Sequence, residues 1–193
     1  MGPHRVVERA AAGELPTWAE ATEERREHMS RVAALLASWS AGLGVPEDER
    51  TRWVALAYLH DALRDADPEK LRGRVPPGLT ALPPSILHGP AAAERLRIDG
   101  VEDGGLLRAV AYHTLGHADL GREGHALYCA DFLEPGRTGL RDEWRAGLRG
   151  RMPEALHEVV REILGARIRH LLETGRPVRP ETMSFWNSLA SEG

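Results

Sequence analysis

Apolar residues recur at helical spacing along nearly the whole chain. Residues 153–174 show this most clearly, with an apolar stripe formed by Leu156, Val160, Ile163, Leu164, Ile168, Leu171 and Leu172. A second stripe lies before residue 44 and consists of Val32, Leu35, Leu36, Trp39 and Leu43. No stretch of the sequence alternates apolar and polar residues as a half-buried strand does, and the sequence has no internal repeat. The pattern therefore predicts an all-α fold.

Capping and stop signals divide this pattern into separate helices. Thr17-Trp18-Ala19-Glu20 has the form of a capping box and predicts a helix from residue 17 to Gly42 or Gly44. Pro46 suits the first turn of a second helix that ends near Asp67-Pro68, and the proline-rich residues 73–84 predict a surface connector. Further helices are expected from residue 84 or 90 through Leu96, over 103–115 with a stop at Gly116, over 123–133, over 153–174, and from Pro180 onward.

The composition is that of an ordinary single globular domain, with 193 residues of which 42% are apolar and 28% charged. We expect an N-terminal extension over residues 1–16, the domain over 17–175 and a C-terminal tail with a short helix over 176–193. The net charge of −4 provides no broad basic surface for a nucleic acid polymer. A single cysteine, Cys129, excludes an internal disulfide, and no apolar run is long enough for a membrane span or a signal peptide. A cytoplasmic protein is expected.

The candidate chemistry begins with His60-Asp61, which follows the apolar run from Trp53 to Leu59. A charged carboxylate at the end of a buried helix is costly unless a metal or an ion pair compensates it. Four more ligand-type residues lie in or beside apolar helical stretches: His28, His88, His113 and Asp131. Imidazoles and carboxylates from several helices are the donor set of a metal site in a helical bundle, and this set favours Fe, Mn, Co, Ni or Zn over Mg or Ca.

The spacing of His60 and Asp61 restricts how both could serve one site. Adjacent helical residues point about 100° apart, so the pair must meet the site at the edge of the helix, or Asp61 must bridge two ions. A simpler interpretation stays open, in which these histidines are hydrogen-bonded core residues of a purely structural helical protein. His117 lies one turn after His113 but beyond the stop at Gly116, and His125 is expected to lie outside the ligand set.

The order of these residues resembles the HD-domain phosphohydrolase superfamily and, more narrowly, the YqeK-type symmetrical diadenosine tetraphosphate hydrolases. The resemblance covers residues 18 to 172 and is carried by Arg25-x-x-His28, His60-Asp61-Ala-Leu-Arg64, Leu87-His88-Gly89, His113-Thr114-x-Gly116 and Ala130-Asp131-Phe-Leu-Glu134-Pro135-Gly-Arg137. Two positions depart from the family pattern: Arg64 replaces the usual lysine, and Leu120 stands where methionine is usual. Neither change removes a presumed metal ligand.

The resemblance implies a single HD-domain helical bundle with a binuclear metal site in its core. The implied ligands are His28, His60, Asp61, His88, His113 and Asp131, with iron as the expected metal and Asp61 as the bridge. The nucleophile would be a metal-bound hydroxide, and a dinucleoside tetraphosphate would be cut in the middle to two nucleoside diphosphates. Cys129 is expected to be buried and unreactive.

The resemblance also suggests roles for residues beside the ligands. Arg64 and Arg137 would bind the phosphates and stabilise the leaving diphosphate. Thr114 would bond a phosphate oxygen or only its own helix backbone. Arg25 is expected to pair with a carboxylate such as Glu134 and to orient the site.

Other functions remain compatible with the same ligands. The substrate could be another nucleotide, such as a nucleoside monophosphate, a deoxynucleotide or a guanosine alarmone, because the metal ligands do not select the substrate. A metal- or nucleotide-binding sensor without turnover is a further alternative. Phe185 and Trp186 are expected to pack on the body or on a second subunit, which leaves a homodimer open.

Overall fold

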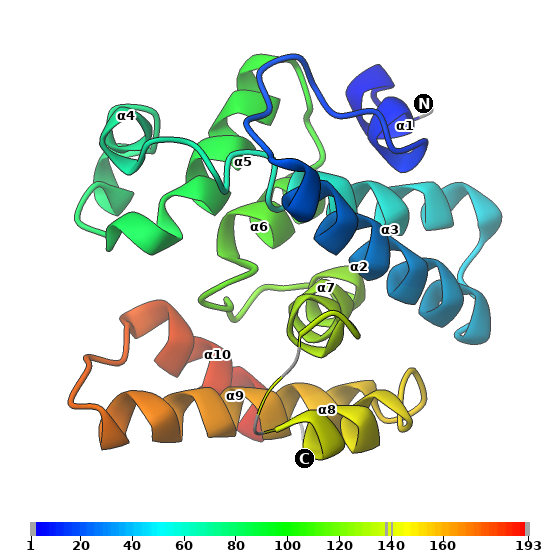
Figure 1. The fold of residues 1–193 in the computed structure, drawn as a ribbon, viewed down its shortest axis with the longest axis vertical. Helices are drawn as coiled ribbons and strands as arrows, with labels where there is room; N and C mark the ends of the chain where they lie inside the picture. Colours follow the sequence, from blue (N-terminus) through cyan, green and yellow to red (C-terminus); the bar gives the residue numbers. More distant parts are fainter. Residues whose placement is uncertain (1–2, 138, 140, 192–193) are drawn as a thin grey trace.

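A computed structural model describes residues 3–137, 139 and 141–191 of the chain (Figure 1). All regular secondary structure in this part is helical, which confirms the all-α prediction. The α-helices are α1 (Arg5–Ala11), α2 (Glu23–Gly42), α3 (Glu47–Leu59), α4 (Pro68–Arg72), α5 (His88–Ile98), α6 (Gly104–Tyr112), α7 (Arg122–Leu133), α8 (Asp142–Arg149), α9 (Leu156–Glu173) and α10 (Pro180–Ser191). Two short 3₁₀ turns, η1 (Pro77–Leu79) and η2 (Pro84–Ile86), lie in the predicted connector. Among the described helices, none combines the length and the apolar character that crossing a membrane requires.

Helix α7 is the central element of the fold. It contacts α2, α3, α6, α8 and α9, and Figure 1 shows it end-on in the middle of the molecule, with α9 running along one side. Its buried residues lie on all sides of the helix: Gly124, Ala126, Leu127, Tyr128, Cys129, Ala130, Asp131 and Leu133. A helix enclosed in this way belongs to the core, so any polar side chain on it must find its partner inside the protein.

The first predicted helix begins later than the capping box at Thr17 indicated. Helix α2 is capped instead by Thr22, whose hydroxyl accepts a hydrogen bond from the Arg25 backbone N–H at 3.3 Å. The segment before it is held away from helical geometry by tertiary contacts, since the Trp18 indole donates to the Asp99 carboxylate at 2.6 Å. Both threonines satisfy the local capping pattern, and these contacts decide between them.

The second predicted helix ends earlier than residue 67, because α3 stops at Leu59. The chain then turns repeatedly, and its backbone pairs with the segment before α2. The Glu20 N–H donates to the Ala62 carbonyl at 2.8 Å, and the Asp65 N–H donates to the Glu20 carbonyl at 3.4 Å. The His60-Asp61 pair therefore lies at and just beyond the helix end, where the angular limit on adjacent helical residues no longer applies.

The sequence pattern missed three of the described helices, α1, α4 and α8. Helix α1 packs on α3 and buries Val7 and Ala10, and α8 contacts α7. At the other end of the chain, α10 packs on α9 and buries Phe185 completely. Both terminal helices thus bury side chains against the body, while the division into residues 1–16, 17–175 and 176–193 stays a prediction.

Gly116 fixes the approach of α10 to the centre of the molecule. Its φ of +77° lies in the left-handed region, and a Cβ built there would overlap the ring of Phe185. Glycine thus meets two requirements here, the backbone turn after α6 and the close contact with α10.

Replacing Gly116 with alanine should therefore destabilise the protein more than the same change at Gly44. Gly44 has a φ of +64° and open space around its Cβ position, so Gly44→Ala measures backbone strain alone, which costs about 1 kcal/mol. Gly116→Ala adds the overlap with the Phe185 ring, and we expect a further loss of about 1–3 kcal/mol. Urea unfolding of the two variants measures the difference; equal losses would contradict the packing argument.

Candidate metal centre

The structure brings the six predicted ligand residues together in one buried cluster, and none of them is more than 7% exposed. Each comes from a different place in the fold except the adjacent pair. His28 lies on α2, His60-Asp61 at the end of α3, His88 at the start of α5, His113 at the C-cap of α6 and Asp131 on α7. We call these six residues the HD cluster.

Asp61 lies at the middle of the HD cluster, and its two carboxylate oxygens face different imidazoles. Oδ2 is 3.7 Å from Nε2 of His28 and 3.6 Å from Nε2 of His60. Oδ1 is 3.1 Å from Nε2 of His88 and 3.5 Å from Nε2 of His113. This is the arrangement that a carboxylate bridging two ions requires.

The donor atoms form two groups small enough to hold an ion each. Within each group all donor atoms lie within 4.8 Å of one another, and the groups are His28, His60 and Asp131, and His60, Asp61 and His113. His60 belongs to both. His88 stands close to the second group, since its Nε2 is 3.1 Å from Nε2 of His113.

Backbone carbonyls orient two of the imidazoles. Nδ1 of His60 lies 2.9 Å from the Ala57 carbonyl, and Nδ1 of His113 lies 2.8 Å from the Val110 carbonyl. A carbonyl can only accept, so Nδ1 carries the proton and the Nε2 lone pair faces the cluster. In the described part of the chain, Nε2 of His60 and of His28 are buried without a hydrogen-bond partner. Buried nitrogens without partners are costly, and a metal ion is the partner that fits them.

Gly89 allows two of the ligands to approach each other. A Cβ at this position would lie 2.8 Å from the Val110 carbonyl oxygen and 3.1 Å from Cε1 of His113. Because glycine has no Cβ, the start of α5 lies directly against the end of α6. The His88 and His113 rings meet as a result, with centroids 5.0 Å apart.

A carboxylate outside the cluster fixes the ring of His28. Glu134, at the C-cap of α7, lies 3.3 Å from Nδ1 of His28 through Oε1. Its Oε2 accepts hydrogen bonds from Nε of Arg31 at 2.6 Å and from the Gly136 N–H at 2.7 Å. Carboxylate–histidine pairs of this kind hold a ligand ring in one tautomer.

The predicted pairing of Arg25 with Glu134 is wrong, because Arg31 occupies that place. Arg25 donates from Nη1 to Oδ2 of Asp61 at 2.8 Å and lies 3.6 Å from Asp65. The register of α2 explains the exchange. The two arginines lie one helical turn on either side of His28, and only the later one faces the end of α7.

Of the three predicted phosphate-binding residues, Arg137 is hydrogen-bonded to Asp131, one of the predicted metal ligands. Its Nε donates to the Asp131 carbonyl and its Nη2 to Oδ1 of Asp131, both at 2.6 Å. Arg64 and Thr114 are partly exposed. Burial lowers the pKa of His88, and the charge of Arg64 adds a smaller contribution in the same direction.

Sequence reasoning missed Arg167, which reaches the cluster from α9. Its Nη1 donates to the Thr114 carbonyl at 3.0 Å, and its Nη2 lies 3.9 Å from Oδ2 of Asp131. The signal was present in the sequence: Arg167 lies four residues after Ile163 and four before Leu171, on the apolar face of a helix. A cation in that position needs an internal partner.

The remaining histidines and Cys129 lie outside the HD cluster. The ring of His117 packs on Tyr112, with centroids 4.6 Å apart, and His125 packs on Phe185 at 5.4 Å. Cys129 is fully buried, as predicted, and burial raises its pKa far above the ordinary value. Its thiol therefore stays protonated and is a poor nucleophile.

The carboxylates of the HD cluster are held ionised, whereas His60 is held neutral. Burial by itself would raise the pKa of a carboxyl, yet the imidazoles of His60, His113 and His88 hold the pKa of Asp61 well below its usual value. Asp131 is likewise held ionised, against its burial, by His28 and Arg137. Burial lowers the pKa of His60 to about 4. The centre thus offers two anionic carboxylates and a neutral imidazole, as metal ligands require.

Residues 25–162 match the family model of the HD domain. The chain belongs to the HD domain family. The match contains all six residues of the HD cluster, and the adjacent His60-Asp61 pair lies at the point where the two donor groups meet.

Three curated relatives share the name symmetrical bis(5'-nucleosyl)-tetraphosphatase. The protein from Halalkalibacterium halodurans is 27% identical over 113 residues, which cover 55% of this HD chain and 56% of the relative. The Bacillus subtilis protein is 28% identical over 143 residues, with 70% and 74% covered. The Staphylococcus aureus protein is 32% identical over 123 residues, with 60% and 61% covered. The matched segments thus span between about half and three quarters of these relatives.

The fold also matches a solved structure over nearly its full length. The crystal structure of a predicted HD superfamily hydrolase involved in NAD metabolism, from Clostridium acetobutylicum, superimposes with a TM-score of 0.77 and covers 97% of this chain and 96% of its own. The two sequences are 19% identical, so this likeness shows the shared HD fold alone.

Asp61→Ala should abolish metal binding, because Asp61 is the residue that faces both donor groups. We expect the metal content of protein purified without a histidine tag to fall at least about tenfold, measured by elemental analysis. Asp65→Ala is the matched control, because Asp65 is a carboxylate four residues further along the chain. It accepts a hydrogen bond from Thr22 and lies 3.6 Å from Arg25. Among the described residues it makes no contact with the imidazoles. Metal retained in Asp61→Ala, or lost equally in both variants, would contradict the central role of Asp61.

Metal loading should weaken on acidification through the titration of His28. Burial opposes the charged ring, but Asp131 and Asp61 outweigh it and raise the pKa of His28 above 6.5. A proton on Nε2 competes with the metal, so affinity should fall by about tenfold for each pH unit below that pKa. Cobalt titrations of the metal-free protein at pH 8 and pH 6 measure the effect. His28→Gln should bind more weakly with a flatter pH dependence; a flat profile in the unmodified protein would contradict the argument.

Proposed function

We propose that this chain is a metal-dependent hydrolase that cuts dinucleoside tetraphosphates, such as diadenosine tetraphosphate, symmetrically into two nucleoside diphosphates. The observation that carries the chemistry is the position of Asp61, whose two oxygens face separate imidazole pairs. The substrate is inferred from the name that the three curated relatives share.

The six residues of the HD cluster would hold two transition metal ions, and their two orphaned imidazole nitrogens support this assignment. When bound, such ions lower the pKa of a water molecule and offset the charge of phosphoryl oxygens. Iron is the proposed native metal, on the resemblance to the YqeK-type hydrolases, with Mn, Co, Ni and Zn as the other members of the set that these ligands suit. Asp61 would span the two ions, and Arg25 would hold its carboxylate in place.

The arginines around the cluster support a polyphosphate as the substrate. Hydrolysis of the central P–O–P bond transfers a phosphoryl group to water and releases a second diphosphate as an anion. Arg64 beside His88 and Arg137 beside Asp131 would supply the cations that stabilise these charges. Thr114, next to His113, would donate a hydrogen bond to a phosphate oxygen.

Product analysis tests the proposal directly. Metal-loaded protein without a tag should convert diadenosine tetraphosphate to ADP as the sole nucleotide product, measured by anion-exchange chromatography. ATP plus AMP would show an asymmetric cut, and turnover only of a monophosphate, a deoxynucleotide or a guanosine alarmone would show a different HD hydrolase. Absence of turnover across this panel in a metal-replete sample would refute the enzyme. The Asp61→Ala variant serves as the blank.

A further inference from the structure

A partly open cavity of about 300 Å³ lies beside the HD cluster, lined mainly by α7, α9, α10 and the segment after α6. We call it the α9 cavity. The lining residues that matter here are Thr114, Tyr128, Phe132, Ala166, Arg167 and Leu171. Aromatic and aliphatic side chains form most of its wall, and a few polar groups stand at its edge, which is the usual makeup of a small-molecule site.

Arg167 stands where the α9 cavity meets the HD cluster. Its guanidinium lies 4.5 Å from the ring centre of Tyr128 and 5.3 Å from that of Phe132. The same group hydrogen-bonds the Thr114 carbonyl and lies 3.9 Å from the Asp131 carboxylate. Stacking and hydrogen bonding hold this cation in one position, so the apolar cavity has a fixed positive charge at the end that faces the metal ligands.

Tyr128 leaves an unmet hydrogen bond at the cavity wall. Its hydroxyl is fully buried and has no hydrogen-bond partner of acceptable geometry among the described residues, although the charge of Arg167 is close. Burial raises the pKa of Tyr128, so the hydroxyl stays protonated and can donate. A buried donor without an acceptor is costly, and an acceptor on the apolar end of a ligand would satisfy it once the wall shifts to admit that atom.

We propose that the α9 cavity is a nucleoside subsite, which takes the base and ribose of one end of the substrate while the attached phosphates pass Arg167 to the HD cluster. The ligand class, a nucleotide, rests on the proposed function; the position of its nucleoside rests on the cavity. A flat base with acceptor nitrogens suits the aromatic wall and the Tyr128 hydroxyl. The anionic phosphates suit the opposite end, where Arg167 lies.

The wall of this subsite is shared between the HD match, which ends at residue 162, and the segment that follows it. Ala166, Arg167 and Leu171 belong to the second half of α9, and Thr182 of α10 closes the cavity while its hydroxyl donates to the Leu115 carbonyl at 2.9 Å. The aromatic residues of the wall, Tyr128 and Phe132, lie on α7 inside the match, and α9 and α10 complete the wall from outside it. Base selection is assigned to α7, α9 and α10 together.

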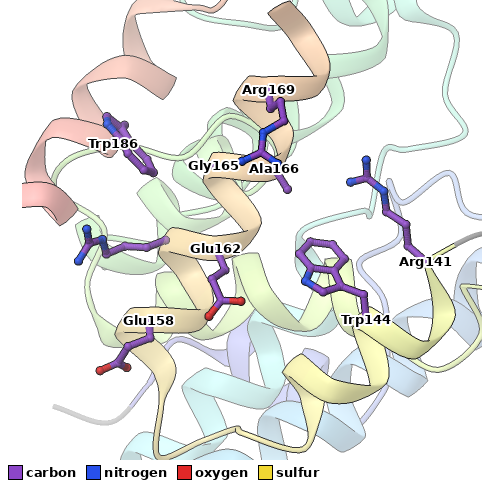
Figure 2. A pocket seen from close by; sticks show the side chains of 9 residues that line it. Arg141, Trp144, Glu158, Glu162, Gly165, Ala166, Arg169 and Trp186 are labelled. Carbon is purple, nitrogen blue, oxygen red and sulfur yellow. The ribbon is translucent and has the colours of Figure 1, made fainter. Parts of the chain in front are cut away.

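A neighbouring surface groove supplies a matched control (Figure 2). This outer groove, about 670 Å³ in volume, runs over the exposed side of α9, with Trp144 on α8 and Trp186 on α10 at its two sides. Ala166 lines both the α9 cavity and the outer groove, whereas Arg169 lines the outer groove alone. Leucine at position 166 adds apolar bulk to the cavity wall, whereas leucine at position 169 shortens a side chain of the outer groove and removes its charge without changing the cavity.

The test compares Ala166→Leu with Arg169→Leu in manganese-loaded protein. Calorimetric titration with ADP and with pyrophosphate, which lacks the nucleoside, separates the two halves of the ligand. We expect Ala166→Leu to weaken ADP binding by at least about tenfold, because the added methylenes fill the base site, and to leave pyrophosphate binding and metal content unchanged. Arg169→Leu should change none of these. The KM for diadenosine tetraphosphate should rise in Ala166→Leu in the same proportion.

Tyr128→Phe is a second variant that removes only the hydroxyl and keeps the packing. We expect it to weaken ADP binding by about fivefold, as the loss of one hydrogen bond does, again with pyrophosphate unaffected. Unchanged ADP affinity in both Ala166→Leu and Tyr128→Phe would overturn the subsite. A loss in Arg169→Leu alone would overturn it in favour of the outer groove.

These results separate the subsite from the proposed function. If ADP binding depends on Ala166 and Tyr128 but diadenosine tetraphosphate is not cleaved, the subsite stands and the proposed substrate is wrong. If the tetraphosphate is cleaved to ADP and both variants bind ADP normally, the proposed function stands and the subsite is wrong.

Discussion

The structure depends on keeping two ionised carboxylates, Asp61 and Asp131, inside a helical core. Moving a carboxylate out of water is costly unless cations and hydrogen bonds replace the solvent. Arg25 supplies this compensation to Asp61 and Arg137 to Asp131, at 2.8 and 2.6 Å. The surrounding imidazoles face the same oxygens. Helices α2 and α7 lie in contact, and His28 of α2 lies 3.3 Å from Asp131 and 3.3 Å from Glu134 at the end of α7.

Helix ends, more than helix surfaces, set the geometry of the HD cluster. His60 and His113 are the C-cap residues of their helices, and each directs its ring through a bond to the carbonyl three residues earlier. His88 opens α5, and Gly89 lets that end lie against α6. The main-chain carbonyls at these two helix ends therefore aim the donor atoms of His60 and His113.

Much of the fold and of the cluster could be predicted from the sequence, since each ligand lies within its own short motif and the apolar stripes have helical spacing. The predicted helices near 103–115, 123–133 and 153–174 agree with α6, α7 and α9 to within a few residues. The start of α2 could not be predicted, because Thr17 and Thr22 both suit an N-cap, and the contacts of Trp18 with Asp99 and of Glu20 with Ala62 decide between them. Arg167 was missed because its partners come from distant parts of the chain.

The position of α9 along the chain imposes an order of assembly during synthesis. All six residues of the HD cluster have been made once the ribosome passes residue 131. Asp131, the last of the six, lies on α7, and α7 packs against α9. Helix α9 contributes four fully buried side chains, Val159, Val160, Ile163 and Leu164. Until these side chains emerge, the core helix has no cover on that side. A growing chain therefore possesses every residue of the HD cluster well before it possesses the enclosure that keeps water away from them.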